Sequence, residues 1–308
     1  MRSNVLITGG SGFIGSHIVD TLIGTTQYKA VTYDINAQNY KDRNTVIIQG
    51  DIFDTDQLVG IMRDSEISSV IHMVGLASIP NCRKNPNASF QLNVASVQNV
   101  LEAMRLCDSE RLIFPSTAAV YGATNGPEVN EEVTPTASNV YGRHKLAAEL
   151  LIRGYADDYG LKCTVLRLFN VYGDLNKEQG VISLFVRRSL ASKPLIVKGG
   201  DQLRDFVFLD DVVQAFVRSL NSEASHGKTI NVGSGVGISI KEIAEMIQRS
   251  FAKAKIKYEL ADKEEYSIYA DVSRMKTTLG CSITDPRVGI PKFIEECKKQ
   301  RKIGGSLQ

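Results

Sequence analysis

The sequence has few cysteines, no long apolar run and no excess charge of either sign. Its five cysteines include no C-x-x-C pair, and an odd number of scattered thiols without metal-ligand spacing is typical of a reduced, cytoplasmic protein. No stretch reaches the length of a transmembrane helix. A net charge of +2 without a long basic run argues against nucleic-acid binding. We therefore predict a cytoplasmic protein that binds no metal, membrane or nucleic acid.

What the sequence does contain is a glycine-rich turn near residue 10. Residues 5–8 are apolar or β-branched, and Gly9, Gly12 and Gly15 follow at G-x-x-G-x-x-G spacing before an apolar helical pattern. The first two glycines put no Cβ between the backbone and a ligand, and the third lets the helix pack close to the strand. The free N–H groups of the helix suit a diphosphate. An ordinary strand-to-helix turn has the same pattern, so the turn alone does not decide between the two.

Apolar strands and helices alternate over the first 168 residues. This order predicts a parallel, doubly wound α/β sheet of the Rossmann type, followed by a smaller C-terminal α/β lobe. We predict a dinucleotide-binding domain over 1–168, to which elements from about 206–236 return, and a mainly substrate-binding lobe over 169–308. The expected strands are 5–8, 29–33, 45–49, 69–73, 112–114, 163–168, 195–197, 206–208, 229–232 and 256–260. The expected helices after the first are 86–106, 140–159, 180–192, 210–221, 239–251 and 287–301.

Carboxylates follow two of these strands. Asp34 lies 19 residues past Gly15, where an acid accepts hydrogen bonds from adenosine ribose hydroxyls and repels a 2′-phosphate, which favours NAD over NADP; the alternative is a surface aspartate. Asp51 either accepts from the adenine amino group or caps the helix that starts near Asp54. Ligands of such sheets bind at the carboxyl ends of the strands. We expect one crevice to be ringed by Gly9, Asp34, Gly75, Thr117 and Asn170.

Two other features are expected to be buried. His72 lies inside an apolar strand, so we expect a packed core histidine rather than an acid or a base. The helix predicted over 86–106 has apolar residues on more than one face. Such a helix is buried on two sides, and we expect the sheet to cover one side and a partner subunit the other.

The predicted helix 140–159 carries a pair of residues with chemical potential. Tyr141 and Lys145 are four residues apart and share a helix face. Lowering a tyrosine pKa from about 10 to about 7 takes about 4 kcal/mol, which one cation about 4 Å away supplies, so Lys145 can make Tyr141 a general base. Thr117 adds a hydroxyl at a strand end. The alternatives are a chance occurrence of the Tyr141 and Lys145 spacing on an exposed helix, and a Thr117 hydroxyl that is hydrogen-bonded to the backbone.

Together these residues resemble the extended short-chain dehydrogenase/reductase family, specifically its NAD-dependent nucleotide-sugar epimerases and dehydratases. The resemblance covers nearly the whole chain, in family order. Besides Asp34, the matching segments are 8–15 (TGGSGFIG), 50–52 (GDI), 72–75 (HMVG), 93–94 (NV), 116–122 (STAAVYG), 141–145 (YGRHK), 167–173 (RLFNVYG), 204–211 (RDFVFLDD) and 231–235 (NVGSG).

The resemblance implies a role for each matching position. Thr117, Tyr141 and Lys145 match the catalytic residues of the family. Asn170 and Arg204 match residues that hold the diphosphate of a sugar nucleotide, for which the arginine fork is suited. Ser78 is also expected to bind substrate, and Ile268 matches the position that gates N-acetylated sugars. The residues that match the NAD site are Gly9, Gly12, Phe13, Ile14, Gly15, Asp34, Asp51, Ile52, Met73, Val74, Gly75, Asn93, Lys145 and Phe169.

The stretch after Thr117 separates the branches of the family. Dehydratases of the family place an Asp-Glu pair there and decarboxylases a Glu, whereas this chain has Ala118 and Ala119. The pattern therefore looks like a UDP-sugar (UDP-glucose type) 4-epimerase. Two family features are absent: an Arg-x-Gly-Asp motif before residues 268–271, where Lys263 could stand in, and a lysine at the position of Ala77.

The resemblance implies a reaction in which the sugar is oxidised at C4 and reduced again on its other face. NAD is regenerated in each cycle, so we expect it to be tightly bound. A UDP-sugar substrate and a homodimer through 86–106 and 140–159 are also implied. The alternatives are a reductase, decarboxylase or dehydratase of the same family and, more distantly, a non-enzymatic dinucleotide-binding scaffold.

Overall fold

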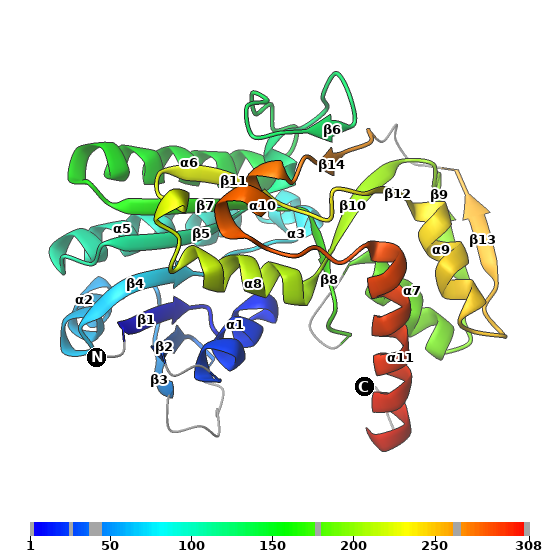
Figure 1. Ribbon diagram of the computed structural model, residues 1–308, viewed down its shortest axis with the longest axis horizontal. Coiled ribbons are helices and arrows are strands. Elements are labelled where there is room, and N and C mark those ends of the chain that lie inside the picture. Colours follow the sequence, from blue (N-terminus) through cyan, green and yellow to red (C-terminus); the bar gives the residue numbers. More distant parts are fainter. Residues whose placement is uncertain (1–2, 25–26, 37–44, 176–179, 261–265, 305–308) are drawn as a thin grey trace.

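A parallel sheet forms the first lobe of the computed structural model (Figure 1), which describes residues 3–24, 27–36, 45–175, 180–260 and 266–304. Within those residues the sheet has seven strands in the order β11-β7-β5-β4-β1-β2-β3, and every neighbouring pair is parallel. The prediction of a doubly wound Rossmann-type sheet is therefore confirmed. Its strands are β1 (Ser3–Thr8), β2 (Tyr28–Asp34), β3 (Thr45–Gln49), β4 (Ile67–His72), β5 (Arg111–Thr117), β7 (Lys162–Leu168) and β11 (Lys228–Val232).

Helices cover both faces of this sheet (Figure 1). One face packs under α2, α5 and α6, and the other under α1, α8 and α10, each face with its own apolar core. Near-continuous apolar strands account for this arrangement, because a parallel sheet is buried on both sides. The helices of the two faces are α1 (Phe13–Ile23), α2 (Thr55–Asp64), α5 (Ser96–Leu106), α6 (Val140–Tyr159), α8 (Leu209–Ser219) and α10 (Ser273–Leu279).

The stretch 206–236 returns to the first sheet only in part. The strand β11 pairs with β7, and α8 packs against α1, as expected. The strand β10 (Leu203–Phe208) instead pairs with β8 (Asn170–Tyr172) and β12 (Gly237–Ser239) in a separate sheet, so the elements that return are α8 and β11. The domain division at residue 168 itself stays a prediction.

In the described part of the second lobe, small sheets and the helices α7, α9 and α11 surround a third apolar core (Figure 1). In its described residues, β8, β10 and β12 form one sheet, β9 pairs with β13, and β6 pairs with β14. These elements are β6 (Glu128–Val129), α7 (Val181–Leu190), β9 (Leu195–Lys198), α9 (Ile240–Arg249), β13 (Ile256–Glu259), β14 (Tyr269–Ala270) and α11 (Pro286–Gly304). Short 3-10 turns, η2 (Ala118–Val120) and η3 (Glu223–Ser225), complete the chain.

The segment 86–106 is not one regular helix. It consists of α4 (Pro86–Phe90), a π-helical turn η1 (Gln91–Ala95) and α5, and α3 (Ile79–Lys84) precedes it. The sheet buries one side of α5, as expected, and α6 packs beside it. The expected cover by a partner subunit stays a prediction. The widened turn carries Asn93, and such π turns often occur at functional sites.

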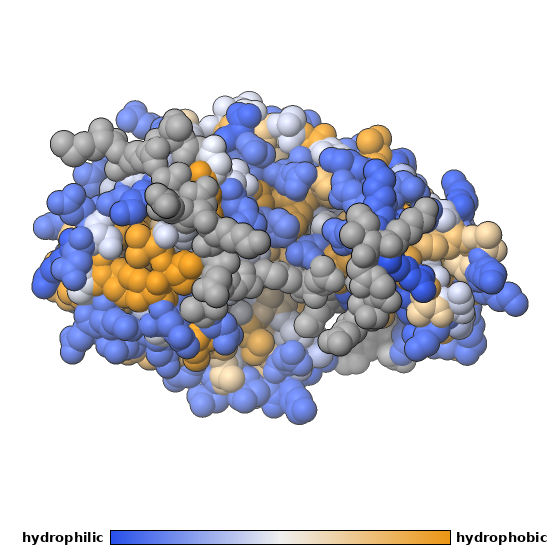
Figure 2. Space-filling model, turned by 90° about the horizontal axis from the view of Figure 1, so that it is seen from below, coloured by the Kyte–Doolittle hydropathy of each residue, from blue (hydrophilic) through white to orange (hydrophobic). Residues whose placement is uncertain are grey.

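The surface is mixed in character. Seen from below, hydrophilic residues surround scattered apolar patches (Figure 2). Among the described helices, none is long and apolar enough to cross a membrane. All five cysteines are free thiols, as their odd number and spacing predict.

Candidate active site

The glycine-rich turn lies at the carboxyl ends of β1, β2 and β4. Gly9 adopts a φ of +72° and donates its N–H to Tyr33 O at 2.9 Å. A Cβ at Gly9 would lie 2.8 Å from the backbone carbon of Met73, and one at Gly15 would lie 2.4 Å from Gly9 O. Gly12 is the N-cap of α1 and has no side chain to satisfy the first N–H groups. A cradle without side chains at a helix N-terminus fits the diphosphate of a dinucleotide.

Asp34 lies at the rim of this cradle. Its carboxylate accepts the N–H of Ser11 at 2.9 Å and the N–H of Asn36 at 2.9 Å. The bond from Ser11 joins the end of β2 to the glycine-rich turn. Contact of Asp34 with a ribose stays a prediction. Phe13 and Ile14 follow in α1, partly buried against the core of that face.

Asp51 does not cap α2, so that alternative is wrong. The N-cap is Asp54, whose side chain accepts from Gln57 N. Asp51 instead accepts the N–H of Phe53 at 3.0 Å and is exposed. Its neighbour Ile52 is buried in the core. Contact of either residue with adenine stays a prediction.

The structure brings Gly75, Asn93 and Lys145 together. A Cβ at Gly75 would lie 2.9 Å from Asn93 Oδ1 and 3.7 Å from Lys145 Nζ. The buried Asn93 amide accepts from Leu76 N and donates to Leu76 O, both at 3.1 Å. These bonds fix the loop after β4 beside the lysine. Three other predicted cofactor contacts lie at strand ends: Met73 and Val74 after β4, half-buried, and Phe169 after β7, buried.

The three predicted catalytic residues come from β5 and α6. Thr117 ends β5, and Tyr141 and Lys145 lie in the first turns of α6, which Asn139 caps through a bond from Gly142 N. A Cβ at Gly142 would lie 2.4 Å from Ala119 O, so only a glycine lets α6 approach the turn after Thr117. The side chains of Thr117 and Tyr141 share a hydrogen bond. Thr117 Oγ1 also accepts from Ala119 N at 3.2 Å, so the backbone contact foreseen as the alternative exists beside it.

The electrostatics differ from the sequence prediction. Burial raises the pKa of Tyr141 to about 12, and only the Thr117 hydrogen bond lowers it. The Lys145 Nζ lies 4.3 Å from the centroid of the Phe114 ring. Burial lowers the pKa of Lys145 itself to about 7. The expected lowering of the Tyr141 pKa is therefore not found, because desolvation outweighs the effects that favour the phenolate.

The predicted substrate residues of the second lobe lie side by side. Asn170 Nδ2 donates to Asp205 O at 2.8 Å. Arg204 forms a parallel bridge with the buried Ile268, and its guanidinium donates to Leu203 O at 3.0 Å and to Tyr266 O. Ile268 therefore lies beside Arg204, the residue that is predicted to bind the diphosphate.

Two other substrate-side predictions have different outcomes. Ser78 caps α3, accepting from Asn81 N at 3.3 Å, and its contact with substrate stays a prediction. Lys263, the possible stand-in for the missing arginine, lies outside the described residues.

His72 is the core histidine that its apolar strand predicts. It is fully buried, with Nδ1 2.6 Å from Thr8 Oγ1 and Nε2 3.1 Å from Ser96 Oγ. Burial, with a smaller effect of Lys145, lowers its pKa to about 3. The ring is therefore neutral at pH 7 and both of its nitrogens have partners.

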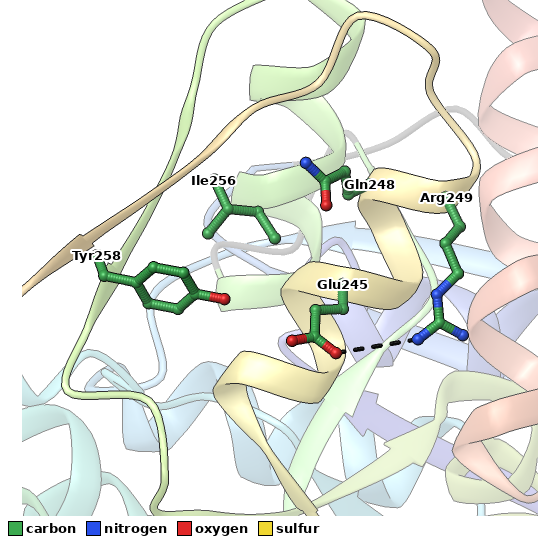
Figure 3. A pocket seen from close by; sticks show the side chains of 5 residues that line it. All are labelled: Glu245, Gln248, Arg249, Ile256 and Tyr258. Carbon is green, nitrogen blue, oxygen red and sulfur yellow. Dashed lines mark ion pairs between the residues drawn. The ribbon is translucent and has the colours of Figure 1, made fainter.

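A surface hollow of about 430 Å³ lies apart from this site, in the second lobe (Figure 3). It is open between α9 and β13, and the Glu245 and Arg249 side chains at its wall lie 3.9 Å apart as an ion pair. None of the predicted site residues lines it. The lining residues are Glu245, Gln248, Arg249, Ile256 and Tyr258.

Sequence reasoning missed a buried cluster behind the catalytic residues. Glu149, one helical turn past Lys145, pairs with Arg167 of β7 and accepts a bond from Ser116. Two signals were available: Glu149 repeats the four-residue spacing of Tyr141 and Lys145, and a charged residue inside the apolar strand 163–168 needs a buried partner. Cys82 of α3 also raises the pKa of both Tyr141 and Lys145. No spacing rule in the sequence indicates this effect.

Comparison with known proteins agrees with this geometry. The profile of the NAD dependent epimerase/dehydratase family matches residues 5–233. The UDP-glucuronate 4-epimerase of Thermodesulfobacterium geofontis is 30% identical over 308 residues, covering 94% of this chain and 93% of that protein.

Two solved structures are similar over nearly their whole length. The UDP-glucose 4-epimerase of Thermotoga maritima, with UDP-glucose, has a TM-score of 0.88 at 28% identity and covers 96% of this chain and 99% of its own. A UDP-N-acetylglucosamine 4-epimerase of Methanobrevibacter ruminantium M1, in complex with UDP-N-acetylmuramic acid, has a TM-score of 0.87 at 27% identity, covering 97% and 100%.

The fold and the site thus define a dinucleotide-dependent enzyme of the short-chain dehydrogenase/reductase type. The chain belongs to the NAD-dependent epimerase/dehydratase family. Its cofactor is NAD, and its reaction class is that of the epimerases to which it is similar.

Proposed function

We propose that this protein epimerises a UDP-sugar at C4, interconverting UDP-glucose and UDP-galactose or their N-acetylated forms. The observation that carries the proposal is the meeting of Thr117, Tyr141 and Lys145 beside Gly75 and the glycine-rich turn. The sequences and structures named above, all of UDP-sugar 4-epimerases, support it.

The residues of the chain have separate tasks in this proposal. Tyr141 Oη takes the proton of the sugar 4-hydroxyl and returns it to the 4-oxygen when the cycle ends. Thr117 hydrogen-bonds both Tyr141 and the 4-oxygen and so aligns them. The Lys145 ammonium, at the end of β4 beside Asn93, holds the nicotinamide ribose. NAD, when bound, supplies the acceptor for the hydride that leaves C4 of the sugar. Its positively charged nicotinamide ring also favours the phenolate of Tyr141, which burial alone opposes.

The turn after Thr117 supports epimerisation over elimination. Ala118 and Ala119 form the 3-10 turn η2 at the place where other branches carry carboxylates. Without an acid in this turn, the 4-keto sugar has no group there to remove a further proton. We infer that the 4-keto sugar rotates within the site and is reduced on its opposite face.

The experiment is to mix the purified protein with single UDP-sugars, without added NAD, and to follow the anomeric signals by NMR. The panel contains UDP-glucose, UDP-galactose, their N-acetylated forms and UDP-glucuronate. The proposal predicts conversion of at least one of the first four sugars to its C4 epimer, because NAD stays bound between cycles, and conversion of UDP-glucuronate alone would contradict it. A product that has lost water or carbon dioxide would contradict it.

We also infer that two copies pair through α5 and α6. These helices lie next to each other on one face of the sheet (Figure 1). Large apolar side chains are exposed there, with Leu106 of α5 42% and Leu150 of α6 64% exposed. Covering them in a dimer removes apolar surface from water.

A further inference from the structure

A buried ion pair lies directly behind Lys145. Glu149 and Arg167 have side chains only 9% and 6% exposed. Two parallel bonds join them, Arg167 Nε to Glu149 Oε1 at 3.1 Å and Nη2 to Oε2 at 2.7 Å. Ser116 donates its hydroxyl to Glu149 Oε1. With three donors, the carboxylate is held in one position and remains an acceptor only.

The location of this cluster connects it to the catalytic residues. Glu149 follows Lys145 by four residues on α6, so both lie on one face of the helix. Ser116 precedes Thr117 in β5 and lies opposite Arg167 in the register of β5 and β7. One carboxylate thus joins the helix that carries Tyr141 and Lys145 to the strand that carries Thr117.

Lys145 needs a nearby negative charge. Its side chain is buried, and burial lowers its pKa to about 7 even with the carboxylate nearby. The Glu149 carboxylate opposes that fall. The other titratable groups around the ammonium are Cys82 of α3, which also opposes the fall, Tyr141 on the same helix, and His72 of β4, which is neutral at pH 7.

We propose that Glu149 is a positioning residue for the reaction: clamped by Arg167 and Ser116, it favours the protonated form of Lys145 beside Gly75. The inference rests on the role of Lys145 in the proposed function. Arg167 serves to hold Glu149 and partly cancels its charge. The alternative is an ion pair that only fastens α6 to the sheet.

Three variants separate these two roles. Glu149→Gln keeps the shape and removes the charge, Glu149→Asp keeps the charge and shortens the side chain, and Arg167→Met removes the opposing cation. A fastening role predicts that all three loosen the fold and that none moves the titration of Lys145. A positioning role predicts opposite movements in Glu149→Gln and Arg167→Met.

The measurement is the titration of Lys145 in full-length protein with ¹³C-labelled lysine, followed by NMR and assigned with Lys145→Met. In Glu149→Gln we expect the inflection of the Lys145 titration to move to lower pH by roughly one unit or more. In Glu149→Asp it should stay near that of the unsubstituted protein. In Arg167→Met it should move to higher pH. The alkaline limb of kcat should move with it. Circular dichroism checks each fold first, and if Glu149→Gln does not fold, the direction in Arg167→Met decides.

An inflection that is unmoved, or that moves the same way in Glu149→Gln and Arg167→Met, would overturn the inference. The NMR readout needs no sugar. Therefore, if the shifts appear but no UDP-sugar is converted, the proposed function fails and the positioning role of Glu149 stands.

Discussion

Tyr141 is the base of the proposed reaction. Its Oη shares a hydrogen bond with Thr117 inside a desolvated site, so no water can replace it as a base at the same position. Tyr141→Phe should therefore lower turnover by roughly 10²- to 10⁴-fold, while NAD and UDP still bind. Steady-state kinetics and calorimetric titration measure the two effects. Tyr159→Phe, a change at an exposed tyrosine of the same helix, is the control and should leave both unchanged. Near-normal turnover of Tyr141→Phe would rule out this base.

His72 should make the fold sensitive to acid. Its pKa is about 3 in the folded protein against an ordinary value of 6.5. Between those values the unfolded chain binds more protons, so stability falls as the pH drops from 6.5 towards 3, by up to about 1.4 kcal/mol per pH unit. Above pH 6.5 the contribution is constant. Urea unfolding at pH 6.5 and 4.5 should show a smaller loss in His72→Gln than in the unsubstituted protein, and equal losses would contradict this.

The same residues show where sequence reasoning about a site ends. The spacing of Tyr141 and Lys145 correctly places both in α6, because helical period is a local property. Their pKa values depend on burial and on groups from β5 and α3, which no local pattern contains. Glu149 and Arg167 are similar: each could be noticed in the sequence, but only the packing of α6 on β7 brings them together.

Among the elements, the glycine-rich turn and α1 depend most on the absence of side chains. A Cβ at Gly15 would lie 2.4 Å from Gly9 O and 3.1 Å from Gly10 Cα. Gly15→Ala should push α1 away from the turn, lowering stability by about 1–3 kcal/mol and NAD binding with it. The matched change Gly154→Ala, in α6 with nothing within 4 Å of the new Cβ, should stabilise the protein by up to about 1 kcal/mol.

Urea unfolding and the NAD content of the purified proteins distinguish these two glycines. Equal effects of Gly15→Ala and Gly154→Ala would show that close packing at the turn is unimportant.

Elements with strong local patterns were predictable and short ones were not. The strands of the main sheet are β-branched runs between turns, and α6 spans 140–159 as its pattern predicts. The strands β6, β8, β12 and β14 have two or three residues each and exist because a distant segment pairs with them. The π turn at Gln91–Ala95 likewise has no local pattern, since the amide of Asn93 and the backbone of Leu76 stabilise it together.

At the scale of the whole molecule, the exposed apolar side chains of α4–α6 predict a dimer. Leu150→Glu places a charge in the middle of the proposed contact and should yield monomers in sedimentation velocity. Val288→Glu is the control, because Val288 is 66% exposed on α11 in the other lobe, and it should leave the dimer intact. A monomer in the unsubstituted protein, or a dimer unaffected by Leu150→Glu, would contradict this interface.

The arrangement of the two lobes could be predicted only in outline. The alternation of strands and helices indicated a doubly wound sheet, and β11 does return to it. The strand β10 instead joins β8 and β12, and Asn170, Arg204 and Ile268 meet around this short sheet. These contacts join residues 170, 204 and 268, and no local signal orders such distant segments.

The central claim is that a hydride leaves C4 of a UDP-sugar and returns to the same carbon. The most direct test uses the UDP-sugar that the NMR panel shows to be converted, labelled with deuterium at C4. The C4 epimer should retain the deuterium at C4, with no exchange into water, because the hydride passes through bound NAD and back. Loss of the label to solvent, or a product that is not the C4 epimer, would contradict the account.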